Sequence, residues 1–167
     1  MGMAALITYV TLGRRRIDYR FILVGAILPD AVDGVLGLFL FEDSQAGRWI
    51  AHSLLAAIVV TLGIIVFSSG ERRLGLFGIG VGWLLHLVAD GMWQAPFTFF
   101  WPAFGLEFSA TPVEPYSLDL FTHPFDHLGT WGGEFAGLAI LAWFWVAFRL
   151  GDAERRRSWL RDGLLRP

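Results

Sequence analysis

Four long apolar segments constrain this chain more than any other feature of its sequence. They cover residues 20–41, 51–69, 74–93 and 131–149. Each has about 19–22 residues, which at roughly 1.5 Å of rise per residue matches a hydrocarbon core about 30 Å thick. The mean hydropathy of +0.56 and the 55% share of hydrophobic residues are typical of a membrane protein. We therefore expect an all-α fold, a polytopic membrane bundle with four main transmembrane helices.

A shorter apolar stretch at the start, MGMAALITYVTLG, predicts one more short helix. It lacks the basic region and the small-residue cleavage site of a secretory signal, so we expect it to remain in a single membrane domain, residues 1–167. The predicted loop 94–130 holds five of the seven prolines and many aromatic residues. Such aromatic density is typical of a segment at the membrane interface, where it could cover a site.

The distribution of arginine predicts the orientation in the membrane. All 13 basic residues are arginine, and all but Arg48 lie before the first span, between the second and third, or at and after the end of the fourth. The positive-inside rule then places the tail 150–167 in the cytoplasm and the loop 94–130 outside an inner membrane. Because the arginines flank apolar segments, we expect lipid and no nucleic acid as a partner. Cysteine is absent, which excludes disulfides and thiolate sites, and the oligomeric state stays open.

Five aspartate and histidine residues lie inside or at the edge of these spans: Asp30, Asp33, His52, His86 and Asp90. A charged group at the bilayer centre costs about 2.5–3.5 kcal/mol on insertion scales, so such residues usually face a protein interior or a wet cavity. Under the predicted orientation, three separate spans carry them at or beyond mid-depth, toward the outer face. The shared depth indicates one site.

The spacing of these residues supports a common site. His86 and Asp90 are four residues apart, and Asp30 and Asp33 are three apart, so each pair shares a helix face. Pro29 lacks an N–H and is expected to disturb its helix beside the two acids. Broken helices at membrane depth are tolerated where they line a cavity.

Histidine and carboxylate side chains together are ligands for divalent metals. We expect these five residues to be metal ligands, with zinc as the first candidate for hydrolysis and manganese or iron as alternatives. An open metal position would lower the pKa of water to about 7 for attack on a phosphoryl or acyl centre. Asp33 or Asp90 would serve as general base or orient a ligand, and Arg48, the one outward arginine, would hold an anionic head group.

The outer loop supplies secondary candidates in THPFDH, residues 122–127. His123 and His127 are four residues apart, with Asp126 beside them. Each candidate also has a structural alternative. His86 with Asp90 can be a hydrogen-bonded pair, the two acids after Pro29 can cap a broken helix, and the other histidines and Arg48 can be interfacial or solvated.

Several motifs in this region resemble a known family. GAILPDAVD (25–33), RWIAHSLL (48–55), GWLLHLVADGMW (82–93) and FWPAFG (100–105) resemble the bacterial membrane-bound metal-dependent hydrolases, which are often compared with zinc-dependent phospholipase C. The matches fall on Asp30 and Asp33, His52 with Ser53, His86 with Asp90, and Trp101 with Pro102. The resemblance implies a helical membrane protein with metal ligands from several helices, and it names no substrate.

We expect a membrane-embedded metal-dependent hydrolase, acting on a phosphoester of a lipid or lipid-linked substrate at the outer face. One alternative is a non-catalytic scaffold in which Asp–His pairs hold helices together. Another is a proton or metal transporter. Apart from Arg20 and Arg149 at their ends, the inner halves of the predicted spans contain no ionisable residue, which disfavours a transport pathway across the whole membrane.

Overall fold

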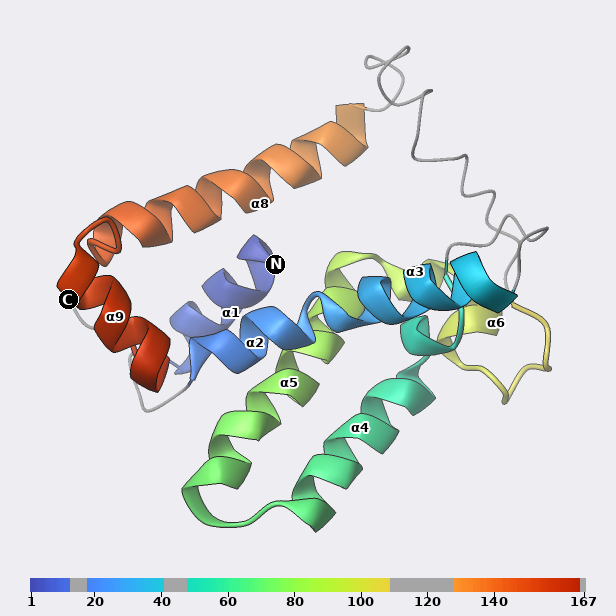
Figure 1. The fold of residues 1–167 in the computed structure, drawn as a ribbon. Helices are drawn as coiled ribbons and strands as arrows, with labels where there is room; N and C mark the ends of the chain where they lie inside the picture. Colours follow the sequence, from blue (N-terminus) through green and yellow to red (C-terminus); the bar gives the residue numbers. More distant parts are fainter. Residues whose placement is uncertain (13–17, 41–47, 109–127, 166–167) are drawn as a thin grey trace.

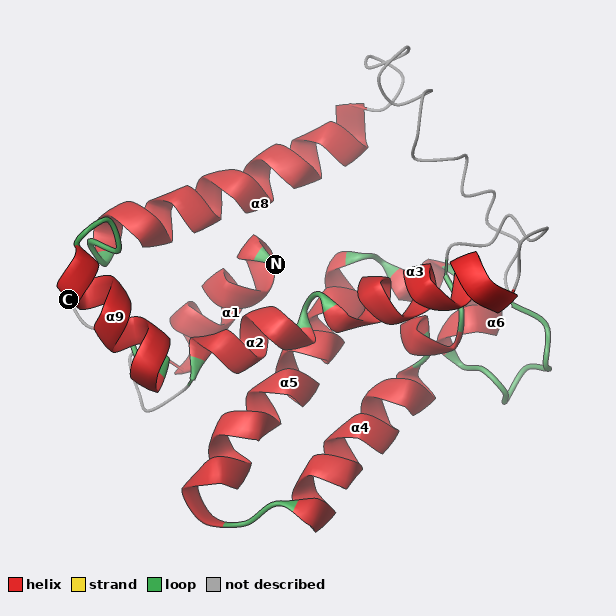
Figure 2. Ribbon diagram, viewed as in Figure 1, coloured by secondary structure: helices red, strands yellow, loops and turns green. Residues whose placement is uncertain are grey.

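The structure, a computed structural model, describes residues 1–12, 18–40, 48–108 and 128–165, and these residues form helices and loops with no strand (Figures 1 and 2). The all-α prediction is therefore confirmed for the part of the chain that is described. The elements are α1 (Gly2–Leu12), α2 (Tyr19–Gly25), α3 (Leu28–Leu40), η1 (Ile50–His52), α4 (Leu54–Phe67), α5 (Gly70–Ala89), η2 (Met92–Gln94), α6 (Pro96–Phe99), α8 (Leu128–Ala147) and α9 (Ala153–Asp162).

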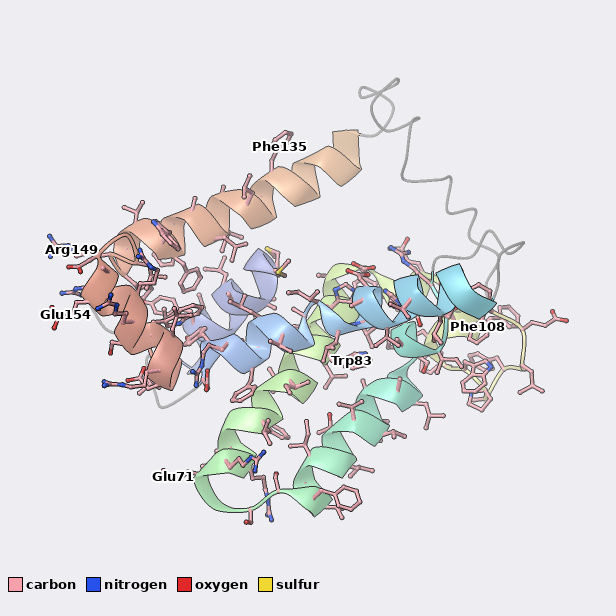
Figure 3. All side chains as sticks on the ribbon, in the orientation of Figure 1. Glu71, Trp83, Phe108, Phe135, Arg149 and Glu154 are labelled. Atoms are coloured by element: carbon pink, nitrogen blue, oxygen red, sulfur yellow. The ribbon has the colours of Figure 1, made fainter. Side chains whose placement is uncertain are left out.

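The prediction of four transmembrane helices is not confirmed at that level of detail. Within the described residues, α5 alone is both long and apolar enough to cross a membrane, while 2–11, 54–67 and 135–147 form shorter apolar helical stretches. Large apolar side chains on α4 and α8 are nonetheless exposed. Val66 and Phe67 are 70% and 91% exposed, and Phe135 on α8 points away from the other helices (Figure 3). Exposed apolar surface on this scale is expected of helices that face lipid.

The first predicted span, 20–41, is two helices rather than one. α2 ends at Gly25, and the chain turns through Ala26 and Ile27 before α3 begins at Leu28. The break lies just before Pro29, which cannot donate a backbone hydrogen bond to the preceding turn. The consequence for the site is that Asp30 lies in the first turn of a new helix.

Small residues let α2 lie directly against α5. A Cβ at Gly82 of α5 would lie 2.2 Å from the carbonyl oxygen of Ile22, and one at Gly25 of α2 would lie 2.1 Å from the carbonyl oxygen of Ile79. Close approach through small residues is the usual way for helices to associate in a membrane, where lipid removes the hydrophobic driving force. This packing fixes the end of α5 relative to the α2–α3 break.

Two hydrophobic clusters stabilise the ends of the bundle. One joins α1, α2 and α8 through the aromatic contacts of Tyr9 and Tyr19 with Phe144, whose rings lie 5.6 and 6.2 Å from those tyrosines. The other joins η1, α4, α5 and η2, and its buried members include Ala51, Trp83 and Met92. Because Ala51 of η1 belongs to this second cluster, the cluster packs against the segment that carries His52 and fixes its position.

A pair of glycine substitutions tests the α2–α5 contact. Gly82→Ala should destabilise the protein by about 1–3 kcal/mol, because the new methyl group meets backbone rather than a movable side chain. Gly63→Ala in α4 is the matched control, since nothing lies within 4 Å of its Cβ position. It should be neutral or stabilise by up to about 1 kcal/mol. Unfolding midpoints in detergent measure both, and equal midpoints for the two variants would contradict the described packing.

Candidate metal centre

Four side chains from three elements converge at one end of α5. Asp30 comes from the first turn of α3, His52 from the end of η1, His86 from the last turn of α5, and Asp90 from the residue that ends α5. Each offers one ligand atom, and these four atoms all lie within 4.8 Å of one another. Of the five residues expected to form one site, the structure brings these four together. Their common depth in the membrane stays a prediction.

The distances within this group suit a small divalent cation. The Nε2 atoms of His52 and His86 are 3.3 Å apart, and they lie 3.3 and 3.4 Å from Asp30 Oδ1. Asp90 Oδ2 is 3.9 Å from His52 Nε2 and 3.8 Å from His86 Nε2. Ligands placed about 2.0–2.1 Å from a tetrahedral zinc ion are roughly 3.3–3.4 Å apart. The Asp/His cluster can hold a metal ion, and its residue types do not identify which one.

Asp33 determines which nitrogen of His52 faces the cluster. Its Oδ2 lies 2.7 Å from His52 Nδ1, and its side chain is fully buried. Because a carboxylate accepts hydrogen bonds, Nδ1 is the donor, and the lone pair of a neutral ring is then on Nε2, pointing toward Asp30 and His86. This is the carboxylate–histidine arrangement that orients metal-binding imidazoles in proteins.

Asp33 also accepts three hydrogen bonds from the backbone around η1. The donors are the N–H groups of Trp49 at 2.6 Å, Ala51 at 3.0 Å and His52 at 3.2 Å. Both oxygens of the Asp33 carboxylate therefore accept hydrogen bonds on the Nδ1 side of His52. The structure places Asp33 outside the four-atom group, which differs from the expectation that Asp33 is itself a ligand and fits the alternative that it orients one. Its position is that of a residue that orients a ligand.

Two further residues, Trp83 and Ser53, stabilise the segment around η1. Neither was predicted from the sequence to have a role at the site. The Trp83 indole donates to the carbonyl oxygen of Ala51 at 2.8 Å, so α5 supports the segment that carries His52. The Ser53 side chain caps α4 by accepting from the N–H of Ala56 at 3.1 Å. A serine directly before an apolar helical run signals this cap in the sequence, whereas the partner of Trp83 has no such local signal.

Arg48 lies beside the cluster and pairs with Asp90. The guanidinium Nη2 is 3.0 Å from Asp90 Oδ2, and the two side chains are 31% and 27% exposed. Exposure also differs across the four candidate ligands, from 1% for His52 and 8% for His86 to 63% for Asp30. The two imidazoles are therefore buried, while the carboxylates and Arg48 lie on the open side.

The aromatic segment after α5 packs against η1. Phe108 contacts Trp49 edge to face at 5.5 Å between ring centroids and stacks on Trp101 at 5.7 Å. Other aromatics of the segment, such as Phe97 and Phe104, are more than half exposed. The aromatic segment therefore lies beside η1, which carries His52, and its place at the membrane interface stays a prediction. The secondary candidates His123, Asp126 and His127 lie outside the described residues.

The described residues form a helical bundle with exposed apolar faces and an Asp/His cluster at the end of α5. These features define a class of helical membrane proteins with a candidate metal centre. The sequence model of the YdjM inner membrane protein family matches residues 1–155, and the chain belongs to this family. It is therefore an inner membrane protein by family. Searches of curated proteins and of solved structures give no match.

Proposed function

We propose that this protein is a membrane-embedded metal-dependent hydrolase whose substrate is a phosphoester of a lipid or lipid-linked molecule. The observation that carries the proposal is the hydrogen bond from His52 Nδ1 to the buried Asp33, which directs Nε2 toward His86 and Asp30. A second-sphere carboxylate that fixes an imidazole tautomer is characteristic of metal centres. The expected orientation places this site at the outer face of the membrane.

The proposed ligands are Asp30, His52, His86 and Asp90, with zinc as the first candidate and manganese or iron as alternatives. When bound, such an ion would lower the pKa of a water molecule and polarise the ester. In hydrolysis the water oxygen bonds to phosphorus, the bond from phosphorus to the leaving alcohol breaks, and a proton ends on that alcohol. Asp90 is the proposed acceptor of the water proton.

Arg48 is the proposed partner for the negative charge of the phosphoester. Its guanidinium already contacts a carboxylate, Asp90, and its planar donors match phosphate equally well. It lies on the open side of the cluster, where a substrate would arrive. Membrane lipid is the proposed source of such a substrate, because the site is attached to α5, the helix long enough to cross a bilayer.

Metal content and hydrolysis, measured together, test this proposal. We expect about one zinc or manganese ion per chain in detergent-purified protein, and none in the double variant His86→Ala/Asp90→Ala. Glu71→Ala is the matched control, because Glu71 lies at the α4–α5 turn, at the other end of α5 (Figure 3). Hydrolysis of p-nitrophenyl phosphate, bis(p-nitrophenyl) phosphate and dioleoyl phosphatidate in mixed micelles should depend on the metal and disappear in the double variant.

Two outcomes would contradict the proposal. A wild-type protein that takes up no metal after incubation with zinc or manganese would leave the cluster as a structural group that holds α3, η1 and α5 together. A metal that binds equally well in the double variant would place it elsewhere. Circular dichroism of both variants shows whether the fold is retained in either case.

A further inference from the structure

A cavity of about 210 Å³ opens directly onto the candidate metal centre. It lies where α1, the α2–α3 break and the end of α5 meet. Three of the four proposed ligands, Asp30, His86 and Asp90, form its polar wall. Any molecule in this cavity is therefore next to the ligand atoms.

The opposite walls of the cavity are apolar. They consist of apolar side chains from two helices, α1 and α5, from the first residue of the chain and from the turn between α2 and α3: Met1, Ala4, Ala26, Ile27, Leu85 and Ala89. Ala4 and Ala26 are buried in the contact between α1, α2 and α5. Alanine at these positions leaves open a space that larger side chains would fill. The cavity thus joins a group of metal-ligating atoms to an apolar wall.

The volume restricts what can enter. It equals roughly seven water molecules at about 30 Å³ each, and it is smaller than the 300–1,000 Å³ or so of typical small-molecule pockets. A whole lipid does not fit, whereas one compact group attached to a phosphoryl centre does. Because the walls away from the ligands carry no charged side chain, the group that fits them is uncharged and apolar.

We infer that this cavity is a substrate subsite for a compact apolar substituent on an anionic phosphoryl group. The inference rests on the proposed function and adds the substrate class to it. The phosphoryl group would lie at the Asp/His cluster near Arg48, and the substituent would enter the cavity between Ala26 and Ala89. Long acyl chains of a lipid substrate would remain outside, along the exposed apolar faces of the helices.

Binding of alkylphosphonates, which are not hydrolysed, tests the inference without an activity assay. Zinc-loaded protein in detergent is titrated calorimetrically with methylphosphonate and with propylphosphonate. Each methylene that enters an apolar cavity should strengthen binding about fourfold. Propylphosphonate, with two more methylenes, should therefore bind roughly fifteenfold more tightly than methylphosphonate.

Two substitutions at neighbouring positions of α5 test whether the preference for propylphosphonate arises in the cavity. Ala89→Phe fills the cavity from its rim, where the residue is exposed, and should remove the preference for propylphosphonate while zinc binding is retained. Val88→Phe is the matched control, because Val88 is 51% exposed and does not line the cavity. It should keep the preference. If Ala89→Phe fails to fold, Ile27→Phe fills the cavity from the opposite side.

The possible failures are distinguishable. Zinc binding with equal affinity for the two phosphonates, or a preference that survives in Ala89→Phe and Ile27→Phe, would overturn the subsite and leave the proposed function intact. Absence of both zinc and manganese binding in the wild type would overturn both.

Discussion

Replacing Asp33 by alanine is expected to lower the free energy of unfolding by about 3–5 kcal/mol, because a buried charged acceptor is removed from partners that cannot reach water. Those partners are the three backbone N–H groups of residues 49, 51 and 52 and the Nδ1–H of His52. The loss should appear as a lower unfolding midpoint in detergent. Of the acids in the site, Asp33 is the one whose loss should affect folding most.

Asp30 provides the matched control, three residues earlier on the same helix. Its side chain is 63% exposed, so Asp30→Ala should change the free energy of unfolding by no more than about 0.5 kcal/mol. It should nevertheless abolish stoichiometric metal binding, since it removes a proposed ligand. Asp33→Asn should retain part of the backbone contacts and weaken metal affinity about 10–100-fold through His52. Equal stability losses in Asp30→Ala and Asp33→Ala would contradict these distinct roles.

Much of the site could be predicted from the sequence because the bilayer makes ionisable residues informative. Asp30, His52, His86 and Asp90 stand out in apolar segments, and the cost of burying them in lipid implies that they face a common interior. If the three predicted spans carry these residues at a similar depth in the membrane, the residues can meet at one site. The helical character of the apolar segments follows from the same constraint, since backbone groups in lipid must be satisfied within the helix.

The sequence did not separate the roles of Asp30 and Asp33. Both acids follow Pro29 and share a helix face, so local spacing treats them alike. The difference arises from the 48–52 segment, whose N–H groups point at Asp33 across a sequence separation of 16 to 19 residues. Such a contact depends on tertiary packing, including the bond from Trp83 to Ala51, and no periodic pattern encodes it.

One helix was not predicted from the sequence. The arginine-rich tail contains α9, which the apolar pattern did not predict because its residues are mainly charged. Its signals are local: Asp152 caps the start by accepting from the N–H of Glu154, and Gly163, with φ of 71°, ends it in the left-handed region. α9 is far from the Asp/His cluster along the bundle, so its omission did not affect the site (Figure 1).

Addition of a divalent metal is expected to stabilise the wild-type protein by an amount set by mass action. A free metal concentration one hundred times the dissociation constant should raise the free energy of unfolding by about 2.7 kcal/mol, and a thousandfold excess by about 4.1 kcal/mol. The physical reason is that the Nε2 atoms of His52 and His86 lie 3.3 Å apart beside two carboxylates, an arrangement that a cation between them satisfies. Unfolding midpoints with zinc, with manganese and with a chelator measure the effect.

His52→Ala should remove this stabilisation, whereas Glu71→Ala at the far end of α5 should retain it. The metal-induced shift should also decrease as the pH is lowered, because protons compete with the metal for the imidazoles. The same experiment tests the scaffold alternative. If Asp–His pairs serve only to hold helices together, their contacts are complete without a cation, so His52→Ala would lower stability while zinc changed neither protein. A metal-induced shift of the same size in wild type and His52→Ala would instead place the binding site away from the Asp/His cluster.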